Sequence, residues 1–128
     1  MNQVKKNKEF IIGYFNAISG VIKSRELCEQ YITDEQLTQH ILFFDGAFPK
    51  YEMFIDEITG EENRIVVRGR FKGRHEGELN GIPPTHKEVF FPFVIGYEIE
   101  KNKIISHWLI ADQMKLMEQL GVMKQTAQ

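Results

Sequence analysis

Hydrophobic residues in the first 48 positions recur every three or four residues, which is the spacing of one helix face. The first such stripe consists of Val4, Ile11, Tyr14, Phe15, Ile18 and Ile22. Ser24 and Asp34 are residue types that cap helix N-termini, and Asp34 precedes a second stripe that contains Leu37, His40 and Phe44. The pattern predicts helices over about residues 3–48.

From residue 51 the hydrophobic period changes to two, as in a strand with one buried face. Residues 51–55 alternate in this way, and residues 65–75 do so more regularly, with arginines and a lysine on the opposite face. Residues 89–99 are apolar at nearly every position, so we expect a central strand that is covered on both sides. The pattern predicts a curved sheet over about 51–111 and a short helix over about 112–121.

Helices that come first and strands that follow as a meander are typical of the α+β class. At 128 residues the chain is long enough for one domain, which we take as residues 1–128. A curved mixed or antiparallel sheet packed on the N-terminal helices would form a cone. Its open end is a natural pocket for a small apolar organic molecule.

Composition narrows the classes of partner. A formal net charge of -2 and a pI near 6.1 argue against a nucleic-acid or anionic-membrane surface. The single cysteine, Cys28, allows no intramolecular disulfide and suits a reducing compartment. No apolar stretch has the length of a signal peptide or a membrane span, so we expect a cytoplasmic location.

His75 follows Phe71 on the apolar face of its strand, so its imidazole is expected to point into the pocket. There it could exchange a proton or orient a substrate carbonyl. The alternative is a buried histidine whose ring is satisfied by the backbone. Phe71, Phe93 and Tyr14 are expected to line the same pocket.

Asp112 is in phase with Trp108 if the last strand extends that far. A carboxylate beside an indole in an apolar cavity would have a raised pKa, which suits a general acid or base. Asp112 also stands directly before a helical pattern, where aspartate is a good N-cap. These two roles do not exclude each other.

Three further histidines have less specific settings. His40 shares a helix face with apolar residues and borders the core, where a histidine is more often structural. His107 is on the opposite strand face from Trp108 and is expected to point away from the pocket, and His86 is expected to be exposed. Four scattered histidines lack the spacing of metal ligands, so we expect no metal.

Several motifs together resemble the SnoaL-like polyketide cyclases, also called ester cyclases, over about residues 37–121. They are HILFF at 40–44, AFPKY at 47–51, RGRFKGRHEGE at 68–78, NGIPPT at 80–85, KIISHW at 103–108, Asp112 and QLG at 119–121. The resemblance implies the cone of the nuclear-transport-factor-like superfamily. It also implies a cofactor-free intramolecular aldol ring closure of a polyketide ester.

By this resemblance the catalytic aspartate of the family falls on Asp112, and the histidine of its Gly-Thr-His segment falls on His75. Two positions depart from the family pattern, because Arg74 replaces the usual threonine and His86 replaces the usual glycine. Both departures are expected near the pocket mouth.

Three hypotheses about function follow. The first is a cofactor-independent cyclase or isomerase in which Asp112 is the acid/base, His75 contacts the carbonyl, and Trp108, Phe71, Phe93, His40 and Tyr14 contact the substrate. The second is a non-catalytic ligand-binding or dimerising scaffold of the same fold. The third is a hydrolytic or hydrating enzyme in which Asp112 activates water. The apolar central strand and the resemblance both favour a homodimer.

Overall fold

The computed structural model describes residues 2–122. Three helices come first, namely α1 (Asn2–Ile18), α2 (Arg25–Glu29) and α3 (Glu35–Ala47). Four strands and a final helix follow: β1 (Glu52–Glu61), β2 (Arg64–Arg74), β3 (Glu88–Glu100), β4 (Lys103–Ala111) and α4 (Gln113–Leu120). This order is the α+β arrangement that the change of hydrophobic period predicted.

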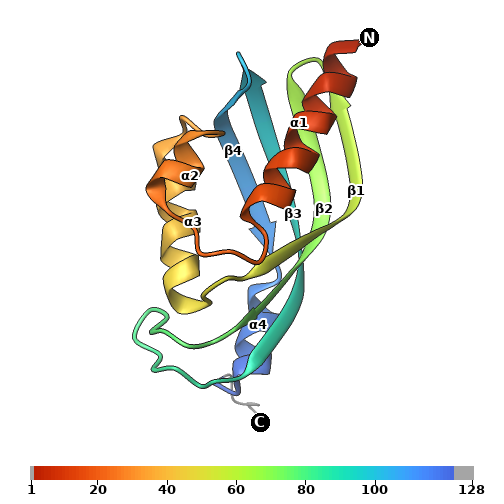
Figure 1. Ribbon diagram of the computed structural model, residues 1–128. Helices are drawn as coiled ribbons and strands as arrows, with labels where there is room; N and C mark the ends of the chain where they lie inside the picture. The colour runs from red at the N-terminus through yellow and green to blue at the C-terminus, as the bar shows by residue number, and fades with distance from the viewer. Residues whose placement is uncertain (1, 123–128) are drawn as a thin grey trace.

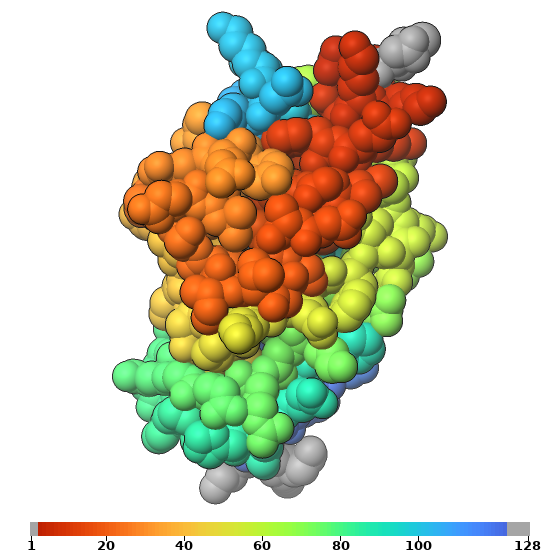
Figure 2. All heavy atoms as spheres, viewed as in Figure 1, coloured from red at the N-terminus to blue at the C-terminus, as the bar shows by residue number. Residues whose placement is uncertain are grey.

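The strands form one antiparallel sheet in the order β1-β2-β3-β4. Figure 1 shows long, curved strands with α1 and α3 on the same side of the sheet and α4 beside the start of β3. Figure 2 shows this side closed by the side chains of α1, α2 and α3, with the loop between β2 and β3 below α3. The sheet and helices therefore enclose the core on the concave face.

The helix ends follow from capping chemistry. The side chains of Ser24, Asp34 and Asp112 each accept a hydrogen bond from the backbone N–H three residues later. Gly121 ends α4 in the left-handed conformation, with φ of 78°. Each capping residue that the sequence suggested is therefore found in that role.

The two faces of β3 differ in their surroundings. Phe91, Phe93 and Tyr97 point toward the helices and are buried, whereas Phe90 on the opposite, convex face is 43% exposed. Nothing within residues 2–122 packs over that convex face, so the expectation that β3 is covered on both sides is not met inside this chain. Also within this range, none of the helices has the length and apolar character that crossing a membrane requires.

Candidate active site

A pocket lies between α3 and the concave face of the sheet, next to the start of α4. Its aromatic lining includes Tyr14, Phe44, Tyr51, Phe71, Phe93 and Tyr97, and aliphatic side chains fill most of the remainder. Its polar lining residues are the three tyrosines, His40 and Gln113. Among residues 2–122 no carboxylate, lysine or arginine lines it.

The three lining tyrosines form one cluster of buried phenols. Tyr14 meets Tyr97 edge to face with ring centroids 6.0 Å apart. Burial is the main cause that raises the pKa of Tyr14, Tyr51 and Tyr97 well above 10.0, and the charge of a neighbouring phenolate would raise each further. At neutral pH these hydroxyls are therefore protonated and can donate hydrogen bonds.

His40 extends from α3 into the pocket wall and packs on Phe44, with ring centroids 4.6 Å apart. Burial lowers the pKa of His40, and the positive charge of a protonated His107 would lower it further. The imidazole is therefore neutral at pH 7, where one ring nitrogen can accept a proton and the other can donate one.

His107 lies on the concave face, which reverses its predicted orientation. Its Nδ1 is 2.7 Å from Oδ2 of Asp34, and both side chains are largely buried. The cause is an irregularity in the pairing of β3 with β4, where Glu98 pairs with Ser106 but Ile99 pairs with Ile104. The extra residue, Ile105, shifts the phase of alternation for the rest of β4.

Trp108 is consequently on the convex face and does not line the pocket, contrary to prediction. Its side chain is 48% exposed and lies flat over Gly96 of β3. A β-carbon at Gly96 would collide with the indole, so this close approach requires glycine. The β4 residues that line the pocket are Leu109 and Ala111. The sequence pattern predicted instead that Trp108 and the residues in phase with it would face the pocket.

Asp112 stands between two lining residues, Ala111 and Gln113, but its own side chain is exposed. Its backbone N–H donates to the carbonyl oxygen of Pro92 over 3.2 Å, and Oδ1 accepts from the N–H of Lys115 over 3.0 Å. The helix-cap geometry is therefore observed, and the carboxylate is at the rim of the pocket rather than inside it.

His75 is fully buried just beyond the end of β2, but it does not line the pocket. Its ring packs on Phe48, and Nδ1 accepts from the backbone N–H of Thr85 over 3.1 Å. Within the described chain Nε2 has no hydrogen-bond partner. Burial lowers the pKa of His75, so the ring is neutral. Phe48 contacts the pocket residues Phe44 and Phe71, which places His75 one aromatic layer behind the wall.

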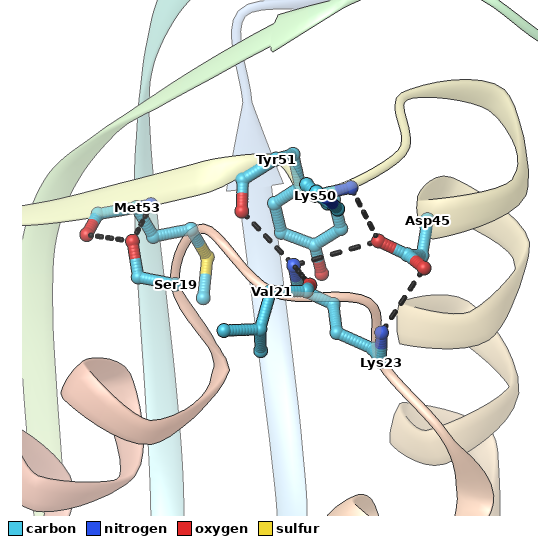
Figure 3. Close-up of polar contacts among 7 residues, drawn as sticks. All are labelled: Ser19, Val21, Lys23, Asp45, Lys50, Tyr51 and Met53. Carbon is cyan, nitrogen blue, oxygen red and sulfur yellow. Dashed lines mark hydrogen bonds and ion pairs between the residues drawn. The ribbon is translucent and has the colours of Figure 1, made fainter.

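A buried ion pair, Lys23 with Asp45, lies against Tyr51, a residue of the pocket lining (Figure 3). Lys23 Nζ donates to the carbonyl oxygens of Val21 and Tyr51 over 2.8 and 2.9 Å, and it lies 3.5 Å from Oδ1 of Asp45. Asp45 accepts two further bonds from the backbone N–H groups of Lys23 and Lys50. Burial lowers the pKa of Lys23, but all three ammonium protons have an acceptor.

The structure therefore brings Tyr14, His40, Phe71 and Phe93 into one pocket, as predicted, and leaves His75, Trp108 and Asp112 outside its lining. The sequence analysis did not identify Tyr51 and Tyr97 as pocket residues. Each lay in a stretch with a signal, because Tyr51 begins the alternating residues 51–55 and Tyr97 belongs to the apolar residues 89–99. No group of three histidine, cysteine or acidic side chains within residues 2–122 could hold a metal ion.

One comparison with known proteins identifies a family. The family model described as "SnoaL-like polyketide cyclase" matches residues 22–120. No curated protein is similar enough to match the chain.

Several solved structures share the fold. AclR from Streptomyces galilaeus, described as a proposed hydroxylase, is 18% identical with a TM-score of 0.81, over 97% of this chain and 86% of that one. A proposed SnoaL-like polyketide cyclase from Jannaschia sp. CCS1 is 20% identical with a TM-score of 0.81, over 94% of this chain and 95% of that one. IdmH from Streptomyces antibioticus, a proposed polyketide cyclase, is 19% identical with a TM-score of 0.74, over 91% and 99%.

Proposed function

This chain belongs to the SnoaL-like polyketide cyclase family, and we propose that it is a cofactor-independent cyclase or isomerase that acts by proton transfer on a small apolar carbonyl compound. One observation carries the proposal. The pocket is lined by aromatic and aliphatic side chains, and its ionisable groups, the three phenols and the His40 imidazole, are neutral at pH 7. Such a site suits a neutral, largely apolar ligand with one or two polar atoms.

Asp112 is the proposed acid/base, because the family resemblance places the catalytic aspartate there and because its two neighbours in sequence, Ala111 and Gln113, line the pocket. In an aldol-type ring closure the carboxylate would remove a carbon-bound proton, and a proton would return to the carbonyl oxygen. A ligand that covers the rim would desolvate the carboxylate and raise its proton affinity.

The test compares Asp112→Asn with Asp112→Ser. Both replacements are good helix N-caps, so both proteins should unfold at nearly the denaturant concentration of the natural protein. On a β-keto ester that the natural protein cyclises, both variants should lose about a hundredfold or more in turnover, the usual range for general acid–base catalysis. Full turnover by either variant would show that Asp112 is only a cap.

A second function, a non-catalytic binding module, is favoured by one specific observation. In the absence of ligand the Asp112 carboxylate is exposed and already bonded to the N–H of Lys115. A carrier would use the same pocket without any proton transfer. Ligand binding without hydrogen–deuterium exchange at the ligand's acidic carbon would favour the carrier.

We also propose that the protein acts as a homodimer in the cytoplasm. The convex face of the sheet exposes Phe90, Trp108 and Ile110, and a second copy could cover them. The basic side chains of that face do not oppose such pairing, because Arg68 and Arg70 are each paired with an acidic residue of β1. A reducing compartment suits Cys28, which is a free and buried thiol.

A further inference from the structure

Tyr51 is the pocket phenol that contacts a buried cation. One face of its ring stacks on Phe71, with ring centroids 4.7 Å apart and planes 27° from parallel. The Lys23 ammonium lies 3.9 Å from the centre of the same ring, and Nζ also bonds the Tyr51 carbonyl oxygen. Backbone and ring are therefore both fixed, with a positive charge against the π system.

The hydroxyl of Tyr51 has no partner of its own. Tyr51 is only 3% exposed, and no hydrogen bond within residues 2–122 reaches its hydroxyl. Among the described residues, Nε2 of His75 is the one side-chain nitrogen or oxygen atom that is fully buried and has no hydrogen-bond partner. The Tyr51 hydroxyl also lacks a partner but is not such an atom, so its oxygen keeps some accessible surface. Because Tyr51 lines the pocket, its accessible donor is available to a ligand there.

The charge on Lys23 is itself held in place. Its three donors meet two backbone carbonyls and Asp45, and Asp45 is fixed in turn by two backbone N–H groups (Figure 3). A lysine whose protons are all engaged is a poor nucleophile, so the pair has no direct chemistry to perform. A fixed cation against a phenol withdraws electron density from the ring and makes the O–H a stronger donor.

We propose that Tyr51 donates the hydrogen bond that holds the carbonyl oxygen of the ligand, and that Lys23, fixed by Asp45, is a positioning residue for Tyr51. The assignment rests on the proposed function for the presence of a carbonyl in the ligand. It gives Tyr51 the role that the sequence analysis gave to His75, which lies behind the pocket wall. During proton transfer the same donor would stabilise negative charge that develops on the carbonyl oxygen.

Binding of two small probes tests this without any turnover. Acetophenone and α-methylstyrene have nearly the same planar shape and differ in a carbonyl oxygen against a methylene group. Dissociation constants of both probes from NMR titration give the ratio of the two affinities in the natural protein and in each variant. Tyr51→Phe should weaken acetophenone by about three- to tenfold, the value of one net hydrogen bond, and leave α-methylstyrene unchanged. Tyr31→Phe, which alters a tyrosine outside the pocket lining, is the matched control.

The role of Lys23 is tested in the double variant Lys23→Met/Asp45→Asn, which removes both buried charges together. We expect a reduced preference for acetophenone with unchanged affinity for α-methylstyrene. A purely structural role would weaken both probes alike, and that result would overturn the positioning role. The proposal for Tyr51 is overturned if Tyr51→Phe leaves the ratio of the two affinities at the value of the natural protein. Neither result bears on whether Asp112 supports turnover, so the two proposals fail separately.

Discussion

His107 on β4 donates from Nδ1 to Oδ2 of Asp34 over 2.7 Å, while Oδ1 of the same carboxylate caps α3. The Asp34 side chain thus caps the start of α3 and also binds His107 of β4. The bond lies next to His40, whose pKa is sensitive to charge on His107. It links the start of α3 to β4, and both elements contribute residues to the pocket lining.

Replacement of Asp34 should separate its two roles. Asp34→Ser keeps a capping oxygen but loses the bond to His107, whereas Asp34→Ala loses both. We expect Asp34→Ala to cost about 1 kcal/mol more than Asp34→Ser, the usual value of an N-cap. Urea unfolding followed by circular dichroism measures the difference. Equal stability of the two variants would mean that the cap contributes nothing here.

Stability should fall as the solution is acidified below neutral pH. Burial lowers the pKa of His40 and His75 in the folded protein, so the unfolded chain binds more protons once the pH drops below the ordinary value of about 6.5. The free energy of unfolding should therefore decrease from that pH down to the folded pKa of each ring. His40→Gln should flatten this dependence. An unchanged slope in His40→Gln would contradict the assignment.

The pattern of the sequence predicted most of the fold because each element carried a local signal. The caps at Ser24 and Asp34 mark helix starts, and a period of two marks the strands. The orientation of Trp108 could not be obtained in this way. The residue that shifts the phase, Ile105, is as apolar as its neighbours, so the irregular pairing opposite Glu98 leaves no trace in composition.

His75 shows a second limit of pattern reasoning. Its alternation with Phe71 correctly predicted a buried, inward position, but the strand ends at Arg74 and the chain then turns toward Thr85. The ring of Phe48 fills the space between His75 and the pocket. The contact between Phe48 and His75 joins the C-terminal end of α3 to the residues just after β2. Contacts between elements that are distant in sequence cannot be predicted from the local spacing of hydrophobic residues.

Replacing one partner of the Lys23–Asp45 pair should destabilise the protein more than replacing both. Lys23→Met leaves the Asp45 carboxylate buried and without its cation, which typically costs about 3–5 kcal/mol. Lys23→Met/Asp45→Asn leaves no unpaired charge and should recover much of that loss. Guanidinium unfolding of the two variants and of Asp45→Asn completes the cycle. A double variant as unstable as Lys23→Met would contradict this explanation.

The proposed dimer makes a prediction about the convex face. Ile110 is 67% exposed, so a charge there costs little in an isolated chain but would be buried between two copies. Ile110→Lys should therefore shift the mass measured by light scattering from that of a dimer to that of a monomer. Lys101→Glu, in the turn between β3 and β4, is the control and should leave the mass unchanged. A natural protein that is monomeric at micromolar concentration would refute the proposal.

The position of Trp108 over Gly96 also determines what the intrinsic fluorescence of this protein can detect. The chain has one tryptophan, and its indole lies on the convex face, with the sheet between it and the pocket. Intrinsic fluorescence will therefore follow events on the outside of the sheet and will be nearly blind to occupancy of the pocket. The molecule contains an optical probe for assembly, and ligand binding must be observed through its tyrosines and His40 instead.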